Sequence, residues 1–254
     1  MQSTTWEEDV RLRVTQQHPK GEAFKQPIPW YARNSTLHSL RYTDWSFLWL
    51  MGLLWHLNLW MEYLVLGWLT LEITNSPFQV ALVAGLRILP MGFFGLFFGS
   101  LGDRFPKRNV LVVAQIVSIC ASVGLAVILL FGVVQMWHIY AATTLGGFAF
   151  AAYLPVRRAL LRDLLPEGAV VNAIYIDTAS FMGMSMMGRF LAGGLLEFIG
   201  PAGTFVVITL SYVAGLLLLL AVPNKRPVPV ISPQEESLIQ VVKQGLSHAL
   251  GSPV

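Results

Sequence analysis

A charged segment of ten residues, 99–108, separates two long apolar runs and fixes much of what this chain can fold into. It contains the cations Arg104, Lys107 and Arg108 and the carboxylate Asp103. The apolar runs on either side are each about twenty residues long, the length of a helix that crosses a bilayer. Because charges at this density are excluded from hydrocarbon, the segment must lie in water. The sequence therefore predicts a tight turn between two membrane-spanning helices.

The composition agrees with a membrane protein. Of the 254 residues, 55% are hydrophobic and only 12% are charged, which is too apolar for an ordinary soluble domain. The net charge of +3 does not indicate nucleic-acid binding, because the basic residues gather at predicted helix ends. Cys120 is the single cysteine, so the chain contains no internal disulfide and no cysteine-based metal site. We expect no metal and no bound cofactor.

The pattern of apolar runs predicts an all-α integral membrane domain of six helices over residues 44–223. The predicted spans are 45–71, 78–99, 110–134, 137–154, 171–199 and 204–222. Residues 1–43 are predicted to be a cytoplasmic tail, and the proline-rich residues 224–254 a cytoplasmic linker. Eight Lys and Arg residues lie in the connections on one side of this topology, and none lies in the three opposite turns. The excess of cations places that side, and both ends of the domain, in the cytoplasm.

Three ionisable side chains are predicted to lie near the middle of the membrane. Counted from the helix ends, Glu62, Arg87 and Arg189 lie at depths of roughly 15, 14 and 16 Å in a hydrocarbon core of ~30 Å. We expect them to form a cluster beside a central cavity, with Glu62 as the protonatable group that couples proton movement to transport. The alternative is that Glu62 and one arginine form a static ion pair.

A fourth ionisable side chain lies nearer the cytoplasm. Asp177 is predicted to lie roughly 10 Å from the cytoplasmic face. It could take part in a substrate pathway, or it could be hydrated from the inner surface.

The charged segment also resembles a known motif. Its pattern resembles the signature between the second and third helices of the major facilitator superfamily of transporters, with Pro106 where that signature usually has glycine. The residues that match are Gly99, Leu101, Asp103, Arg104, Lys107 and Arg108. The resemblance implies that they latch the two halves of a transporter on the cytoplasmic side and so act as a gate. The simpler alternative is a loop that only sets orientation.

A second stretch, 153–173, resembles the connection between the fourth and fifth helices in the bacterial branch that contains the enterobactin exporters and macrolide efflux proteins. That branch usually has a Gly-Pro pair in the fifth helix, whereas this chain has Gly188 and Arg189. The resemblance implies a secondary transporter of a bacterial cytoplasmic membrane. It would export a small molecule of unspecified identity by alternating access, driven by an ion gradient.

Six spans are half of the twelve-helix major facilitator fold, so we expect the amino-terminal half of a transporter. A truncated product is favoured, because residues 244–248 resemble the start of the connection to a seventh helix; assembly with a second six-helix half or a homodimer is the alternative. The rival interpretation is a non-transporting remnant, or a fragment that acts only by packing against other helices. An enzyme is not expected, because Gly183-Met184-Ser185 lacks the second glycine of a nucleophile motif at Met187.

Overall fold

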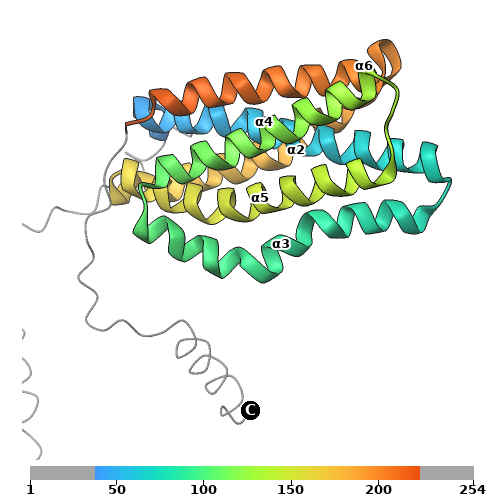
Figure 1. The fold of residues 1–254 in the computed structure, drawn as a ribbon. Helices are drawn as coiled ribbons and strands as arrows, with labels where there is room; N and C mark the ends of the chain where they lie inside the picture. Colours follow the sequence, from blue (N-terminus) through green and yellow to red (C-terminus); the bar gives the residue numbers. More distant parts are fainter. Residues whose placement is uncertain (1–37, 224–254) are drawn as a thin grey trace, which may run out of the picture.

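The computed structural model describes residues 38–223, with the backbone alone at 38, 96, 99–104 and 167, and this part of the chain contains no strand. A 3-10 helix precedes five long α-helices that lie side by side in an elongated bundle (Figure 1). The elements are η1 (His38–Arg41), α2 (Thr43–Thr74), α3 (Pro77–Arg104), α4 (Lys107–Leu130), α5 (Met136–Leu164) and α6 (Glu167–Ala221). Residues 1–37 of the predicted tail and the predicted linker, 224–254, lie outside the described residues.

The last helix, α6, is divided at Gly200. This residue has φ 70° and ψ 179°, a conformation that favours glycine, and Pro201 follows it inside the helix. Figure 1 shows α6 turning back on itself at this point. The predicted fifth and sixth spans are therefore the two parts of one broken helix, residues 167–199 and 201–221, and the structure has five long helices where six were predicted.

Four of these helices are long and apolar enough to cross a membrane. The qualifying segments are Pro77–Gly95, Lys107–Leu130, Met136–Leu164 and Gly168–Ala221. Helix α2 has 32 residues, which is sufficient length, but His56, Asn58 and Glu62 in its middle lower its apolarity. The described part of the chain is thus a helical bundle of membrane-protein character.

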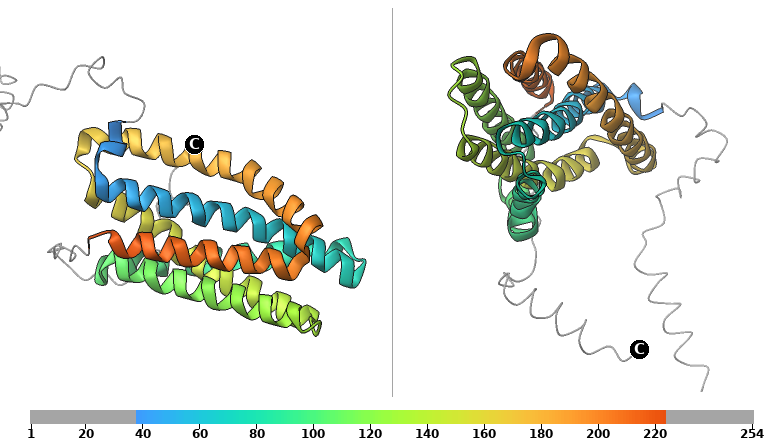
Figure 2. Two further views of the ribbon diagram at one scale, coloured as in Figure 1. Left: turned by 90° about the horizontal axis from the view of Figure 1, so that it is seen from above. Right: turned by 90° about the vertical axis from the view of Figure 1, so that its right-hand side faces the viewer.

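Helix α2 lies in the centre of the bundle. It packs mainly against α6, while α3 packs on α5, and α4 packs on α5 and α6 (Figure 2). The core around α2 is aromatic: the Trp55 ring stacks on Tyr153 at a centroid distance of 4.1 Å and meets Tyr212 edge-on at 5.5 Å. Because α2 has neighbours on most sides, the polar side chains in its middle, His56, Asn58 and Glu62, are buried against protein.

The turns at one end of the bundle have recognisable local causes. Asn75 caps α2 in the left-handed conformation, with φ 48°, and its N–H donates to the Leu71 carbonyl. Gly132 has φ 67° just beyond α4, and Gln135 and His138 form a capping box at the start of α5. These turns reverse the chain within a few residues.

Two helices extend beyond their predicted ends at the opposite end of the bundle. Helix α3 continues through the charged segment to Arg104, so the turn before Lys107 is shorter than predicted. Helix α5 continues through Pro155 to Leu164, whereas the predicted span ended at Leu154. A proline is tolerated inside a membrane helix where neighbouring helices satisfy the freed backbone groups. We call this end, which carries Lys107, Arg108 and Arg162, the basic end.

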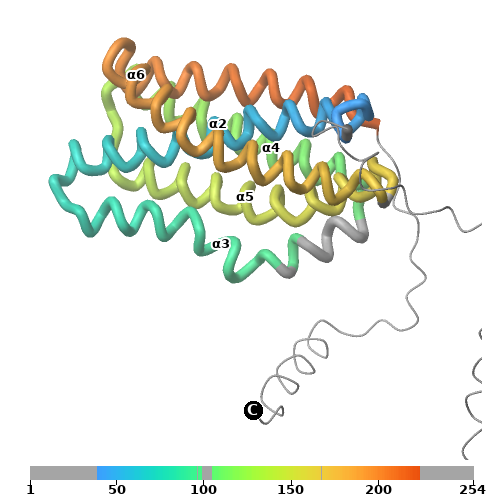
Figure 3. Tube along the Cα trace, turned by 180° about the vertical axis from the view of Figure 1, so that it is seen from behind, coloured from blue at the N-terminus to red at the C-terminus, as the bar shows by residue number. Residues whose placement is uncertain are grey.

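Helix α3 bends near its middle, as Figure 3 shows. Pro90 lies inside the helix at this region, and an interior proline removes one backbone hydrogen bond. The bent segment lies close to α5, because a Cβ atom added to Gly147 would lie 2.6 Å from the Arg87 carbonyl oxygen and 3.0 Å from Pro90 Cγ. The glycine on α5 therefore allows α3 to approach and brings Arg87 into the bundle.

Candidate functional site

The middle of the bundle contains a buried ion pair. Arg87 Nη2 on α3 lies 2.5 Å from Glu62 Oε2 on α2, and the two side chains are only 4% and 9% exposed. Tyr63 lies under the guanidinium at 5.2 Å, and the Tyr212 side chain on α6 is within hydrogen-bonding reach of Glu62. The pair therefore connects α2 and α3, and Tyr212 connects it to the second part of α6.

A small cavity adjoins this pair. It has about 10 Å³ of space, enough for one water molecule at most. Its lining comprises Glu62, Leu66, Arg87, Ser118, Ala121, Ser122, Leu125, Ala142, Gly146 and Phe205. The serine hydroxyls donate to carbonyls of their own helix, Ser118 to Ala114 and Ser122 to Ile119. A protonatable carboxylate thus lies beside a guanidinium, several hydroxyl groups and room for a single water.

Arg189 does not join this ion pair, although it was predicted to lie at the same depth. Its guanidinium carbon lies 4.1 Å from the centroid of the Trp60 ring, and its Nη1 donates to the Ser185 carbonyl at 3.0 Å. The Arg189 side chain is exposed, whereas Glu62 and Arg87 are buried. The structure therefore pairs two of the three predicted charges, Glu62 and Arg87, and stacks the third, Arg189, on the Trp60 ring.

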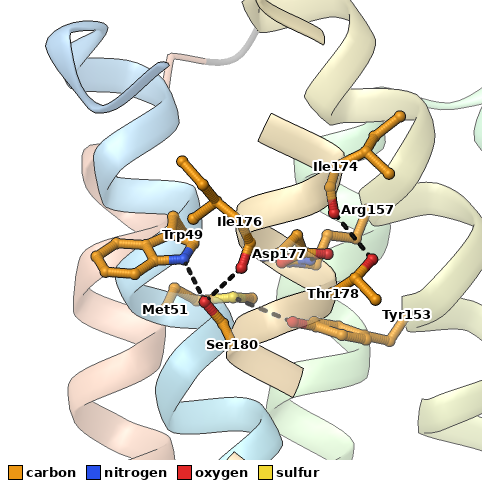
Figure 4. Close-up of polar contacts among 9 residues, drawn as sticks. All are labelled: Trp49, Met51, Tyr153, Arg157, Ile174, Ile176, Asp177, Thr178 and Ser180. Atoms are coloured by element: carbon orange, nitrogen blue, oxygen red, sulfur yellow. Dashed lines mark hydrogen bonds and ion pairs between the residues drawn. The ribbon is translucent and has the colours of Figure 1, made fainter. Parts of the chain in front are cut away.

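Asp177 is part of a second ion pair nearer the basic end (Figure 4). Arg157 Nη1 on α5 lies 2.6 Å from Asp177 Oδ2 on α6, and the exposed fractions of these side chains are 2% and 17%. In the same region, the Trp49 indole N–H on α2 donates to the Ser180 hydroxyl at 2.9 Å. Asp177 is thus mostly shielded and has a cationic partner.

Sequence reasoning missed Arg157 as a functional residue. It was assigned to a polar connection after residue 154, but α5 continues past it. Its guanidinium lies against Gly52 of α2, where an added Cβ would lie 2.8 Å from Arg157 Cζ. The one available signal was the helical spacing of the apolar side chains that follow it, Leu160, Leu161 and Leu164, all of which are buried.

The motif residues Lys107 and Arg108 tie the helices together at the basic end. Lys107 Nζ lies 2.6 Å from Asp163 Oδ2 at the end of α5. Arg108 donates from Nε and Nη2 to the carbonyls of Leu219 and Leu220, at 3.2 and 2.6 Å. A cation at a helix C-terminus is favourable, because the last carbonyls carry partial negative charge. Gly99, Asp103 and Arg104 form the last turns of α3, and their side chains lie outside the described part.

Within the described residues, no group of three or more His, Cys, Asp or Glu side chains could hold a metal ion. The candidate site therefore consists of two buried ion pairs, the exposed Arg189 on Trp60, and the contacts at the basic end.

Known proteins resemble this chain in sequence. Three curated relatives are an uncharacterized MFS-type transporter, YfiS, of Bacillus subtilis, the staphyloferrin A transporter of Staphylococcus aureus and a bicyclomycin resistance protein homolog of Haemophilus influenzae. They are 22%, 23% and 26% identical over 77%, 63% and 60% of this chain. The alignments cover 46%, 41% and 37% of those proteins, so the chain spans about half their length or less.

A solved structure shares the fold. The POT family transporter PepTSo aligns with a TM-score of 0.58 at 15% identity, covering 82% of this chain and 47% of PepTSo. Residues 34–254 also match the family model described as transmembrane secretion effector. This match covers most of the chain, and two of the relatives are named as transporters. The chain therefore belongs to the transmembrane secretion effector family of major facilitator transporters, and it is a multi-pass membrane protein.

Proposed function

We propose that this chain is a six-span unit of a secondary transporter in a bacterial cytoplasmic membrane. It works with a second six-span unit and exports a small molecule by alternating access, driven by an ion gradient. The six spans are α2, α3, α4, α5 and the two parts of α6. The observation that carries the proposal is the buried pair of Glu62 and Arg87. Placing a carboxylate deep in a membrane bundle costs free energy, and ionisable residues at such positions mark substrate and proton pathways.

The pair provides a route to coupling. Protonation of Glu62 removes the negative charge that compensates Arg87, and it changes the partner available to Tyr212. A change of charge in a bundle of packed helices favours a different arrangement of α2, α3 and α6. In this scheme Glu62 carries the proton, and the loss of the ion pair with Arg87 changes the packing of the neighbouring helices.

The basic end provides the gate. The contacts of Lys107 with Asp163, and of Arg108 with the carbonyls of α6, tie the start of α4 to the ends of two other helices. Breaking a few such contacts requires only a few kcal/mol, about the size of a typical conformational bias. The excess of cations at this end favours a cytoplasmic location.

A labelling experiment tests the topology. In a Cys120→Ser background, Phe105→Cys places a thiol at the basic end, and Val133→Cys places one at the opposite end; both native side chains are exposed. A membrane-impermeant maleimide added to intact cells is expected to label Val133→Cys only, and Phe105→Cys only after permeabilisation. The reverse pattern would contradict the proposed orientation.

A transport experiment tests the coupling. Everted vesicles from cells that express the chain, alone or with a second six-span unit, are acidified by respiration, and the pH gradient is followed with a fluorescent amine. Aromatic carboxylates and amphipathic cations are then added in turn. A proton-coupled exporter releases part of the gradient on addition of a substrate, and Glu62→Gln at equal expression abolishes this release. Release that is equal in the variant would show that the ion pair is only structural.

A further inference from the structure

Arg189 carries a positive charge that the described residues do not neutralise. The ion pairs of the described part join Arg87 to Glu62, Lys107 to Asp163, and Arg157 to Asp177, and none involves Arg189. Of the five N–H donors of its guanidinium, one bonds the Ser185 carbonyl. The mid-bundle set of Glu62, Arg87 and Arg189 therefore has a net charge of +1.

The position of Arg189 is fixed by the residue before it. A Cβ atom on Gly188 would lie 2.8 Å from the Leu57 carbonyl oxygen and 2.9 Å from Trp60 Cβ, so α6 and α2 touch backbone to backbone here. This close approach brings the Trp60 ring under the guanidinium at 4.1 Å. A cation held over an aromatic face keeps the edge of its guanidinium available for a ligand.

The surface next to Arg189 is aromatic and apolar. Trp60 contacts Tyr63 on the next turn of α2, with ring centroids 5.6 Å apart, and Tyr63 borders a hollow of about 40 Å³ between α2, α3 and α5. On α6, Met186 and Phe190 are 77% and 78% exposed. A positive charge thus lies at one edge of an apolar surface that leads to a small hollow.

We propose that Arg189, supported by Trp60, is the anion subsite of the transport path, and that it takes the carboxylate of an amphipathic small molecule whose apolar body lies over Trp60 and Tyr63. This inference rests on the proposed transport function, because it names the substrate class of that path. A lipid phosphate is a poor occupant, since Arg189 lies near mid-depth, roughly 15 Å from the headgroups. Two parallel N–H donors of a guanidinium match the two oxygens of a carboxylate.

Binding to the purified full-length chain tests this proposal. The probe is 2-naphthoate, measured by equilibrium dialysis in dodecyl maltoside with detergent-only cells subtracted, and 2-naphthamide supplies the same aromatic body without the charge. We expect saturable binding of naphthoate. Naphthamide is expected to bind at least about tenfold more weakly than naphthoate. Arg189→Gln is expected to weaken naphthoate binding about tenfold or more and to leave naphthamide binding unchanged.

The matched control is Arg158→Gln, which removes another exposed arginine from the same bundle and is expected to leave naphthoate binding unchanged. Equal binding of naphthoate and naphthamide, unchanged naphthoate binding in Arg189→Gln, or no saturable binding to the wild-type chain would overturn the proposal. Should Arg189→Gln fail to assemble, Arg189→Lys keeps the charge but loses the planar fork, and it is expected to bind naphthoate several-fold more weakly. Unchanged binding in that variant would overturn the proposal as well.

This test is independent of the transport assay. Saturable, Arg189-dependent binding together with no release of the pH gradient would support the anion subsite and contradict coupled transport. Release of the gradient by aromatic carboxylates that Arg189→Gln leaves unchanged would support transport and contradict the anion subsite.

Discussion

Replacing Glu62 with glutamine would leave the Arg87 guanidinium buried without its carboxylate. Arg87 is only 4% exposed and lies 2.5 Å from Glu62, so bulk water cannot replace the lost charge, and the adjoining cavity has room for one water molecule at most. Removing one partner of a buried ion pair costs about 3–5 kcal/mol, because the other charge stays desolvated. We expect Glu62→Gln and Arg87→Gln each to lower the free energy of unfolding by about this amount.

The double variant distinguishes a coupled pair from two independent sites. With both charges removed, two amides replace the salt bridge and no buried charge remains at this site. We therefore expect the double variant to be more stable than the sum of the single effects predicts, by about 2–3 kcal/mol. The assay is unfolding of the purified chain in mixed micelles of rising dodecyl sulfate content, followed by circular dichroism.

Glu197→Gln on α6 is the matched control. This carboxylate is exposed, so its replacement should change the free energy of unfolding by no more than about 0.5 kcal/mol. Additivity of the two single variants within about 0.5 kcal/mol would refute the reasoning, since the two side chains would then not interact. An effect of Glu62→Gln no larger than that of Glu197→Gln would refute it equally.

Three further predictions concern close contacts between helices. Gly188→Ala should lower the free energy of unfolding by about 1–3 kcal/mol, because the new methyl group meets the α2 backbone; Gly183→Ala, where nothing lies within 4 Å, should be neutral or slightly stabilising in the same assay. Gly52→Ala should displace Arg157 from its ion pair and cost about 3–5 kcal/mol, and an unchanged midpoint would show that the side chain moves freely. Lys107→Gln removes a partly exposed ion pair and should cost only about 0.2–1 kcal/mol; a larger loss in the micelle assay would show that the contact is more than a surface bridge.

The depth of a residue in a membrane helix can be predicted from the sequence, but its direction around the helix cannot. A helix rises 1.5 Å per residue, so counting from predicted helix ends put Glu62 and Arg87 at one level, and the structure pairs them. Arg189 lies on α6, and the same count gave it a similar depth. Its direction depends on how α6 crosses α2, which Gly188 and the facing backbone determine. Depth alone therefore could not separate the partner of Glu62 from the arginine that stacks on Trp60.

The ends of the helices were also not predicted correctly from the sequence. Pro155 followed by several arginines is typical of a loop, and a proline in isolation does break a helix. In the bundle, α5 continues past Pro155, and Gly52 on α2 leaves space for the Arg157 guanidinium. The local sequence of α5 contains no information about that glycine, which lies about a hundred residues earlier in the chain. The Arg157 ion pair, which depends on three helices, can therefore be identified only once the arrangement of the helices is known.

Helix α2 lies in the centre of the bundle, although it carries polar side chains in its middle. Helix α2 is absent from the four segments that are apolar enough to cross a membrane, and His56, Asn58 and Glu62 are the reason. All three residues are buried in the structure, with 3%, 0% and 7% of the whole residue exposed. Polar groups facing lipid would cost several kcal/mol in total, so a long helix can carry them only if other helices surround it. Weak apolarity in an otherwise membrane-length helix is therefore a sequence signal for a central position, and the side chains that cause it are the ones to test first for function.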